Sequence, residues 1–265
     1  MDNRKASIAV FDSGLGGISV LAELVKILPN ENFIYFGDTA NAPYGVRSAE
    51  EVRRLTFSVY EYLKGNENIK AFVIACNTAT SVAVAALRAK YPNDVIIGVE
   101  PALKPAALCK EHPTVAVLAT PLTLKEEKFA SLLGRYSGKA NVIPFACAGL
   151  VEFVERGEIS GDRLHAFLCD LLSPLRDASL DAVVLGCTHY PFVKNEIARV
   201  LGDDILIFDG SVGTARETKR RLELCDLLND TDEKGEVVFI DSSYPNDKNS
   251  DRSMLTRFGG EYLCN

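Results

Sequence analysis

Two cysteines, Cys76 and Cys187, stand in closely similar surroundings and have the chemistry needed to move a proton. Each follows a short apolar run and precedes hydroxyl and other polar side chains, in the segments ACNTAT and GCTHYP. A free thiol has a pKa of about 8.5, so a modest change of surroundings makes it a proton donor or acceptor near neutral pH. Two thiols on opposite faces of one carbon can remove a proton from one face and return a proton to the other, which is the chemistry of racemisation.

Other interpretations of these cysteines remain open at the level of sequence. Both can be core residues, since buried cysteines behave as small hydrophobes. Cys187 and His189 with Cys76 can form a zinc site, although no C-x₂-C or H-x₃₋₅-H spacing supports a closed tetrahedral one. A Cys-His hydrolase or isomerase would use Cys187 and His189 but leave Cys76 without a role. A binding or sensor protein without chemistry would need neither thiol for affinity.

The elements that must position these cysteines begin with four short apolar runs in the first 100 residues. The predicted strands are IAVF (8–11), FIYF (33–36), FVIA (72–75) and VIIGV (95–99). None alternates cleanly with polar residues, which is typical of a parallel sheet buried on both faces. Helical spacing separates them, and Ser48 with Glu51 predicts a capping box at the start of one helix. Alternating strands and helices indicate right-handed βαβ units.

The same order recurs about 110 residues later. Further strands are predicted at VAVL (115–118), VIPF (142–145), VVLG (183–186) and ILIF (205–208). In order, the strands pair as Ile8 with Val115, Phe33 with Val142, Phe72 with Val183, and Ile96 with Ile205. The separations all lie between 107 and 111 residues. This regularity predicts an α/β fold of two similar domains with mainly parallel sheets, related by duplication.

The remaining tail predicts a helix (TARETKRRLELCDLL), a strand (VVFID, 237–241) and a final helix. These elements have no counterpart in the second half, so we expect them to complete the first domain. The predicted domains are residues 1–97 with 210–265, and residues 98–209. Two chain crossings imply a cleft between the domains, and ligands of open α/β sheets bind beyond the carboxyl ends of the strands. We therefore expect the active site in that cleft.

Polar residues follow the other strands of the first half as well. The first strand runs into Asp12 and Ser13, within FDSGLGG, and a helix begins directly afterwards. Free backbone amides at such a helix start favour an anion such as a substrate carboxylate. Asp12 is also placed to act as an acid-base partner. The second strand runs into GDTANAPYG, where Tyr44 and Gly45 can donate hydrogen bonds.

Composition narrows the class of protein. The chain has 265 residues and a formal net charge of −7, so the general electrostatic signature of nucleic-acid binding is missing. The basic run at Lys219–Arg221 is interpreted as a solvated helix face. No stretch approaches the roughly 18 apolar residues of a membrane span, and no secretory signal is visible. Seven widely spaced cysteines indicate reduced thiols and a cytoplasmic protein rather than a disulfide framework.

Taken together, the blocks VFDSGLGG, GDTANAPYG, ACNTAT and GCTHYP closely resemble the glutamate racemases of the aspartate/glutamate racemase superfamily. The resemblance runs from Ile8 to about Phe208. It implies an isomerase that interconverts L- and D-glutamate without pyridoxal phosphate or metal, in the cytoplasm, and supplies D-glutamate for peptidoglycan synthesis. Glutamate rather than aspartate comes from this resemblance alone. Family members often form homodimers, and no nucleic-acid or membrane partner is expected.

The resemblance also implies roles for individual residues. Cys76 matches the base that acts on D-glutamate, assisted by Asp12, and Cys187 matches the base that acts on L-glutamate, assisted by His189. Other matching positions bind the substrate, and these are Asp12, Ser13, Tyr44, Gly45, Asn77, Thr78, Thr188, His189 and, as secondary positions, Thr120 and Glu152.

Overall fold

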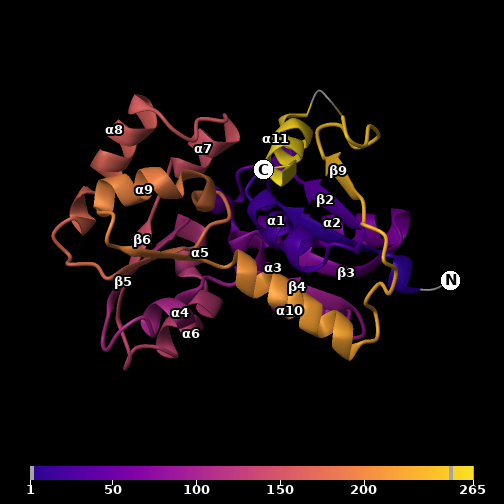
Figure 1. Ribbon diagram of the computed structural model, residues 1–265, viewed down its shortest axis with the longest axis horizontal. Helices are drawn as coiled ribbons and strands as arrows, with labels where there is room; N and C mark the ends of the chain where they lie inside the picture. Colours follow the sequence, from indigo (N-terminus) through magenta and orange to yellow (C-terminus); the bar gives the residue numbers. More distant parts are fainter. Residues whose placement is uncertain (1–2, 251–252, 265) are drawn as a thin grey trace.

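The computed structural model describes residues 3–250 and 253–264 and contains two parallel β-sheets, each covered by helices (Figure 1). We call each sheet with its helices a lobe. The first sheet has the order β4-β3-β1-β2-β9. Its strands are β1 (Ser7–Asp12), β2 (Phe33–Gly37), β3 (Ile69–Ile74), β4 (Val95–Gly98) and β9 (Val237–Asp241). Every neighbouring pair in this sheet is parallel.

The second sheet has the order β6-β5-β7-β8 and is also parallel throughout. Its strands are β5 (Thr114–Ala119), β6 (Asn141–Ala146), β7 (Ala182–Leu185) and β8 (Leu206–Asp209). Matching β1–β4 with β5–β8 gives the same neighbours in both sheets, with β9 as an extra edge strand in the first. All nine predicted strands are confirmed, and the shared order is what a duplicated unit requires.

Both faces of each sheet are buried, as the apolar strands predict. In β1, Ile8 and Val10 pack on one face, while Ala9 and Phe11 pack on the other. This alternation follows from the opposite directions of successive strand side chains. The helices associated with the first sheet are α1 (Ile18–Ile27), α2 (Ala49–Asn66), α3 (Asn77–Lys90), α10 (Ser211–Leu224) and α11 (Met254–Cys264).

The second sheet is covered in the same way, with Ala116 and Leu118 of β5 facing one cluster and Val115 and Val117 the other. The helices associated with the second sheet are α4 (Leu103–Ala107), α5 (Pro121–Lys125), α6 (Glu127–Gly134), α7 (Leu150–Glu155), α8 (Asp162–Leu171) and α9 (Lys194–Leu201). Short 3₁₀ helices complete the structure at η1 (Asn3–Lys5), η2 (Thr39–Asn41), η3 (Tyr44–Val46), η4 (Ser173–Leu175) and η5 (Tyr190–Val193).

The C-terminal segment returns to the first lobe. After β8 the chain enters α10, which packs against α1 and β4, and β9 then pairs with β2 (Figure 1). The chain therefore passes from the first sheet to the second after β4 and back after β8. The exact domain boundaries at residues 98 and 209 stay a prediction.

Local sequence signals explain where α2 begins. Ser48 is its N-cap, and the Ser48 hydroxyl accepts a hydrogen bond from the Glu51 amide at 3.2 Å. The carboxylate of Glu51 pairs with Arg47, so only the hydroxyl half of the predicted capping box is seen.

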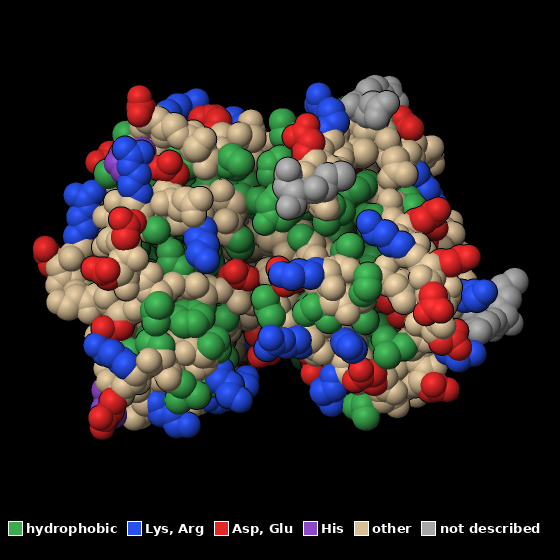
Figure 2. Space-filling model, viewed as in Figure 1, with side chains coloured by type: hydrophobic (Ala, Val, Ile, Leu, Met, Phe, Trp, Pro, Cys, Tyr) green, Lys and Arg blue, Asp and Glu red, His purple; other side chains and the backbone are tan. Residues whose placement is uncertain are grey.

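The basic run lies on α10, where Lys219 and Arg220 are exposed and Arg220 pairs with Glu217. Figure 2 shows acidic and basic side chains interspersed over the face drawn, with a notch between the lobes at its lower edge. Among the described residues, no helix is long and apolar enough to cross a membrane.

Candidate active site

The turn after β1 places a carboxylate at the junction of the lobes. Asp12 is fully buried, and its Oδ1 accepts a hydrogen bond from the Gly14 amide at 2.8 Å. The Tyr35 hydroxyl donates to the Gly14 carbonyl at 2.8 Å and so fixes the turn from β2. Burial raises the pKa of Asp12, while the charge of His189 and the hydrogen bonds from Gly14 and Thr188 oppose the rise. The pKa of Asp12 is thus set by the balance between burial and these polar partners.

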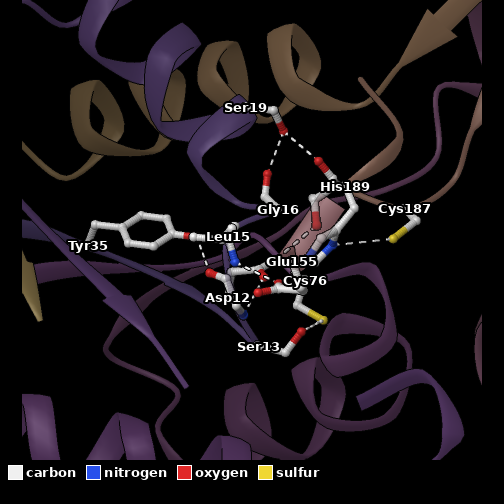
Figure 3. A network of polar contacts seen from close by, with 12 residues as sticks. Asp12, Ser13, Leu15, Gly16, Ser19, Tyr35, Cys76, Glu155, Cys187 and His189 are labelled. Carbon is white, nitrogen blue, oxygen red and sulfur yellow. Dashed lines mark hydrogen bonds and ion pairs between the residues drawn. The ribbon is translucent and has the colours of Figure 1, made fainter. Parts of the chain in front are cut away.

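Cys76 lies two residues beyond β3 and is the N-cap of α3. Its sulfur accepts a hydrogen bond from the Ala79 amide at 3.4 Å and lies 3.6 Å from the Ser13 hydroxyl (Figure 3). Burial and the nearby Asp12 carboxylate raise the pKa of Cys76 to about 12, although the bonds to Ala79 and Ser13 lower it. Cys76 is therefore a protonated thiol near neutral pH.

Cys187 lies two residues beyond β7 in the second lobe, the position that corresponds to Cys76. Its sulfur is 3.7 Å from Nδ1 of His189, and Nε2 of His189 contacts the Glu155 carboxylate (Figure 3). Burial lowers the pKa of His189, but the hydrogen bonds to Cys187 and Glu155 and the charge of Glu155 raise it well above its usual value. The imidazole therefore keeps both protons at neutral pH, and Nδ1–H points at the Cys187 sulfur.

The contact that raises the pKa of His189 lowers the pKa of Glu155. Burial raises the pKa of Glu155, and the hydrogen bond and charge of His189, with the Leu15 amide, bring it below the usual value. The Leu15 amide donates to Glu155 Oε1 at 2.9 Å. One carboxylate thus ties the first-lobe turn to the second-lobe histidine.

Further hydrogen bonds join the lobes beside this contact. The Thr188 hydroxyl donates to Asp12 Oδ2 at 2.9 Å, and the Ser19 hydroxyl donates to the Thr188 carbonyl at 3.0 Å. Gly16 permits this approach, because a Cβ at that position would lie 2.3 Å from Nδ1 of His189. The two cysteine-bearing strand ends therefore face one another across the lobe junction.

A small pocket lies at this junction and is lined by residues of both lobes. Its lining is Ser13, Pro43, Tyr44, Gly45, Cys76, Asn77, Thr78, Thr120, Val151, Cys187, Thr188 and His189. The structure thus brings together every residue of the predicted site except Asp12 and Glu152. Asp12 lies just behind the lining, bonded to Thr188.

Two parts of the lining are arranged in ways that the sequence did not reveal. The Tyr44 hydroxyl donates to Asp38 at 2.5 Å rather than standing free. The hydroxyls of Thr78, Thr120 and Thr123 lie 2.9–3.1 Å from one another and join α3 to the start of α5. Thr123 was missed by the sequence analysis, since only its spacing from the N-cap of α5 marks it.

The acidic residue beside His189 is Glu155. The resemblance predicts Glu152 as a secondary substrate-binding position, and that role stays a prediction. Glu152 lies one turn earlier on α7, is half-buried and is not among the residues that line the cavity. Both glutamates occur in the same short stretch, LVEFVERG, and no spacing rule distinguishes them. Glu155 is the last residue of α7, and its carboxylate contacts both His189 and the Leu15 amide.

The buried amide of Asn77 is a further feature of the site. Asn77 Oδ1 is buried and has no hydrogen-bond partner, although it belongs to a cavity-lining side chain beside Cys76. Buried acceptors are nearly always satisfied, so this oxygen is available to a ligand donor.

The zinc site considered from the sequence can be compared with the structure. No group of three or more His, Cys, Asp or Glu side chains able to hold a metal occurs within residues 3–250 and 253–264.

Comparison with known proteins decides the family. The family model described as Asp/Glu/hydantoin racemase matches residues 9–218. A curated glutamate racemase of Clostridium novyi is 50% identical over 242 residues, which cover 91% of this chain and 93% of the relative. This chain belongs to the Asp/Glu/hydantoin racemase family. The resemblance drawn from the four sequence blocks is confirmed.

Solved structures of the family share the whole two-lobed fold. A glutamate racemase from Bacillus anthracis matches with a TM-score of 0.84 and 29% identity, covering 99% of this chain and 95% of that one. A Francisella tularensis glutamate racemase in complex with D-glutamate matches with a TM-score of 0.81 and 30% identity, covering 98% and 94%. The predicted fold class, two α/β domains with mainly parallel sheets, is therefore confirmed.

Proposed function

We propose that this chain is a glutamate racemase that interconverts L- and D-glutamate with two opposed thiols. The observation that carries the proposal is the placement of Cys76 and Cys187 at corresponding strand ends, lining one cavity from opposite lobes. The identity of about 50% to curated glutamate racemases supports glutamate as the substrate. The D-glutamate formed would supply peptidoglycan synthesis.

The two thiols have different electrostatic surroundings in the ligand-free site. Protonated His189 lies against the Cys187 sulfur, and a cation stabilises negative charge on a neighbouring thiol. Cys187 is therefore the base that removes the α-proton of L-glutamate, while Cys76, with its raised pKa, is the acid that protonates the opposite face. After one turnover in this direction, Cys187 holds the proton and Cys76 is the thiolate.

The reverse reaction uses the same groups with exchanged roles. Cys76 removes the proton from D-glutamate, and the Cys187 thiol beside His189 protonates the other face. Asp12 is close enough for its charge to affect the pKa of Cys76, so it is the group placed to accept charge or a proton as Cys76 reacts. Asp12 and His189 thus assist Cys76 and Cys187 respectively.

The lining offers donors and acceptors that suit an amino acid. The start of α3 presents backbone amides and the hydroxyl of Thr78, and Ser13 and Thr120 add hydroxyls nearby, so carboxylates are favoured there. The unpartnered Asn77 Oδ1 is an acceptor for the substrate ammonium group. Gly45, Tyr44 and Thr188 complete the proposed binding set.

Both proton transfers are supplied by side chains, so we propose that no cofactor is required. We also propose a cytoplasmic location, which suits the free cysteines of the described chain. A homodimer is the assembly that the resemblance predicts, and light scattering after size-exclusion chromatography measures it.

Racemisation in heavy water tests the two-base mechanism. L-Glutamate is incubated with enzyme in D₂O and sampled at low conversion. If Cys187 removes the proton and Cys76 delivers another, the D-glutamate formed carries deuterium while recovered L-glutamate carries almost none. Early deuterium in recovered L-glutamate, at a rate close to that of product formation, would show that one base serves both faces.

The single variants Cys76→Ala and Cys187→Ala provide the matched comparison. Each should abolish racemisation, because either direction needs one acid and one base. A variant that keeps substantial racemisation would contradict the opposed-thiol proposal. Circular dichroism at 222 nm verifies that each variant is folded.

A further inference from the structure

A second cysteine–histidine pair lies outside the active site, on the helices of the second lobe. Cys169 and His165 are four residues apart on α8 and so share one face of that helix. The Cys169 sulfur is 3.5 Å from Nε2 of His165. Nδ1 of the same imidazole lies 3.2 Å from Oε2 of Glu196, which comes from the adjacent helix α9.

The order of contacts defines the roles of the three groups. A carboxylate only accepts hydrogen bonds, so Nδ1 of His165 carries the proton shared with Glu196. Nε2 is then free to accept the thiol proton of Cys169. Nucleophile, base and a carboxylate that orients the base are the arrangement that activates a thiol. Nη1 of Arg199 lies 3.7 Å from Oε2 of Glu196 and places a cation beside that carboxylate.

The group is separate from the proposed catalytic site and reaches solvent. None of its three members lines the cavity that contains Cys76 and Cys187. Cys169 is half-buried, and the side chain of His165 is 28% exposed, so a small reagent can approach. Helices α8 and α9 lie at the outer side of the second lobe (Figure 1).

We propose that Cys169 is a modification site for small disulfides, activated by His165 and Glu196. His165 Nε2 takes the thiol proton, and the Cys169 sulfur attacks one sulfur of the disulfide. The disulfide S–S bond breaks as a new S–S bond to Cys169 forms. The departing thiolate takes the proton from His165 and leaves as a thiol. Cys169 is oxidised, and half of the disulfide is reduced.

Cys225 provides an internal standard for the test. It is exposed and forms no side-chain hydrogen bond within residues 3–250 and 253–264, so exposure alone would make it the faster of the two thiols. Trypsin cleavage after Arg163 and Arg176 isolates Cys169 in one peptide, and cleavage after Arg221 and Lys234 isolates Cys225 in another. Mass spectrometry of these peptides follows both thiols in one sample.

The folded, full-length chain is incubated with hydroxyethyl disulfide, a small neutral disulfide, at pH 7.5. Cys169 is expected to form the mixed disulfide at least about fivefold faster than Cys225, because Nε2 of His165 lies 3.5 Å from its sulfur and is placed to take the proton as the sulfur attacks. Dithiothreitol should restore the free thiol. A Cys225 rate equal to or above that of Cys169 would overturn the proposal.

Two variants separate activation from simple access. His165→Asn should slow modification of Cys169 by about fivefold or more while leaving the Cys225 rate unchanged, and Glu196→Gln should slow it by a smaller factor. His112→Asn alters an exposed histidine elsewhere and is the matched control. Unchanged Cys169 rates in both His165→Asn and Glu196→Gln would show that exposure alone governs this thiol. Retained racemisation shows that each variant is folded.

Discussion

The carboxylate of Glu155 contacts Nε2 of His189 on the side of the imidazole away from Cys187. His189 therefore lies between a carboxylate and a sulfur, and its proton on Nδ1 faces the sulfur. The same carboxylate accepts the Leu15 amide, so it also holds the lobes together at this point.

Glu155→Gln is expected to lower kcat/KM about 10- to 100-fold. Glu155 raises the pKa of His189, so removing its charge lowers that pKa and the imidazolium is lost at lower pH. The alkaline limb of the kcat/KM profile should therefore move to lower pH. The value of kcat/KM must stay equal for L- and D-glutamate, because the equilibrium constant between enantiomers is one.

Glu152→Gln is the matched comparison, since it makes the same change one turn earlier on α7. Its pH profile should stay close to that of the wild type. A large effect at Glu152 with none at Glu155 would contradict this role of Glu155 and support the substrate-binding role predicted for Glu152.

Asp12→Asn is expected to stabilise the protein while it slows racemisation. The folded-state pKa of Asp12 is raised, so the wild type is most favoured when this group is protonated, at low pH, and loses that contribution as pH rises through the folded pKa. Asn removes the buried charge and keeps the acceptor for Gly14. Thermal melts at pH 8 should show a Tm about 2–4 °C above the wild type, with the difference vanishing near pH 4. A lower Tm at pH 8 would refute this account.

Cys76 is expected to contribute no thiolate in the ligand-free enzyme at pH 8, because its pKa is raised to about 12. Thiolate absorbance near 240 nm should therefore be the same in Cys76→Ser as in the wild type. A clear loss of absorbance in Cys76→Ser would reverse the assignment of acid and base at rest.

Gly16→Ala is expected to reduce racemisation at least about 100-fold, because the added Cβ would lie 2.3 Å from Nδ1 of His189 and 2.7 Å from the Thr188 hydroxyl. His189 or the lobe contact must then move. Gly65→Ala is the control, since a Cβ there meets nothing within 4 Å and the residue lies in α2. It should leave activity unchanged and stabilise the fold by up to about 1 kcal/mol. Full activity in Gly16→Ala would show that the close approach is dispensable.

The sequence by itself determined the strands, their duplicated order and the corresponding positions of Cys76 and Cys187. These follow from local properties: runs of apolar residues specify strands buried on both faces, and the residue just past a parallel strand lies at the sheet's carboxyl edge. The prediction that the tail supplies a strand was also local, because VVFID has strand composition wherever it pairs.

Only the tertiary structure decided which side chains meet across the lobes. The contacts of Asp12 with Thr188 and of Leu15 with Glu155 join residues more than 130 positions apart, so they depend on how two separately built sheets pack. Which glutamate of α7 contacts His189 depends on the rotation of that short helix. A sequence pattern fixes the face of an element that is buried, whereas the partner of each polar group on that face is set by the orientation of the lobes and by the need to satisfy buried charges.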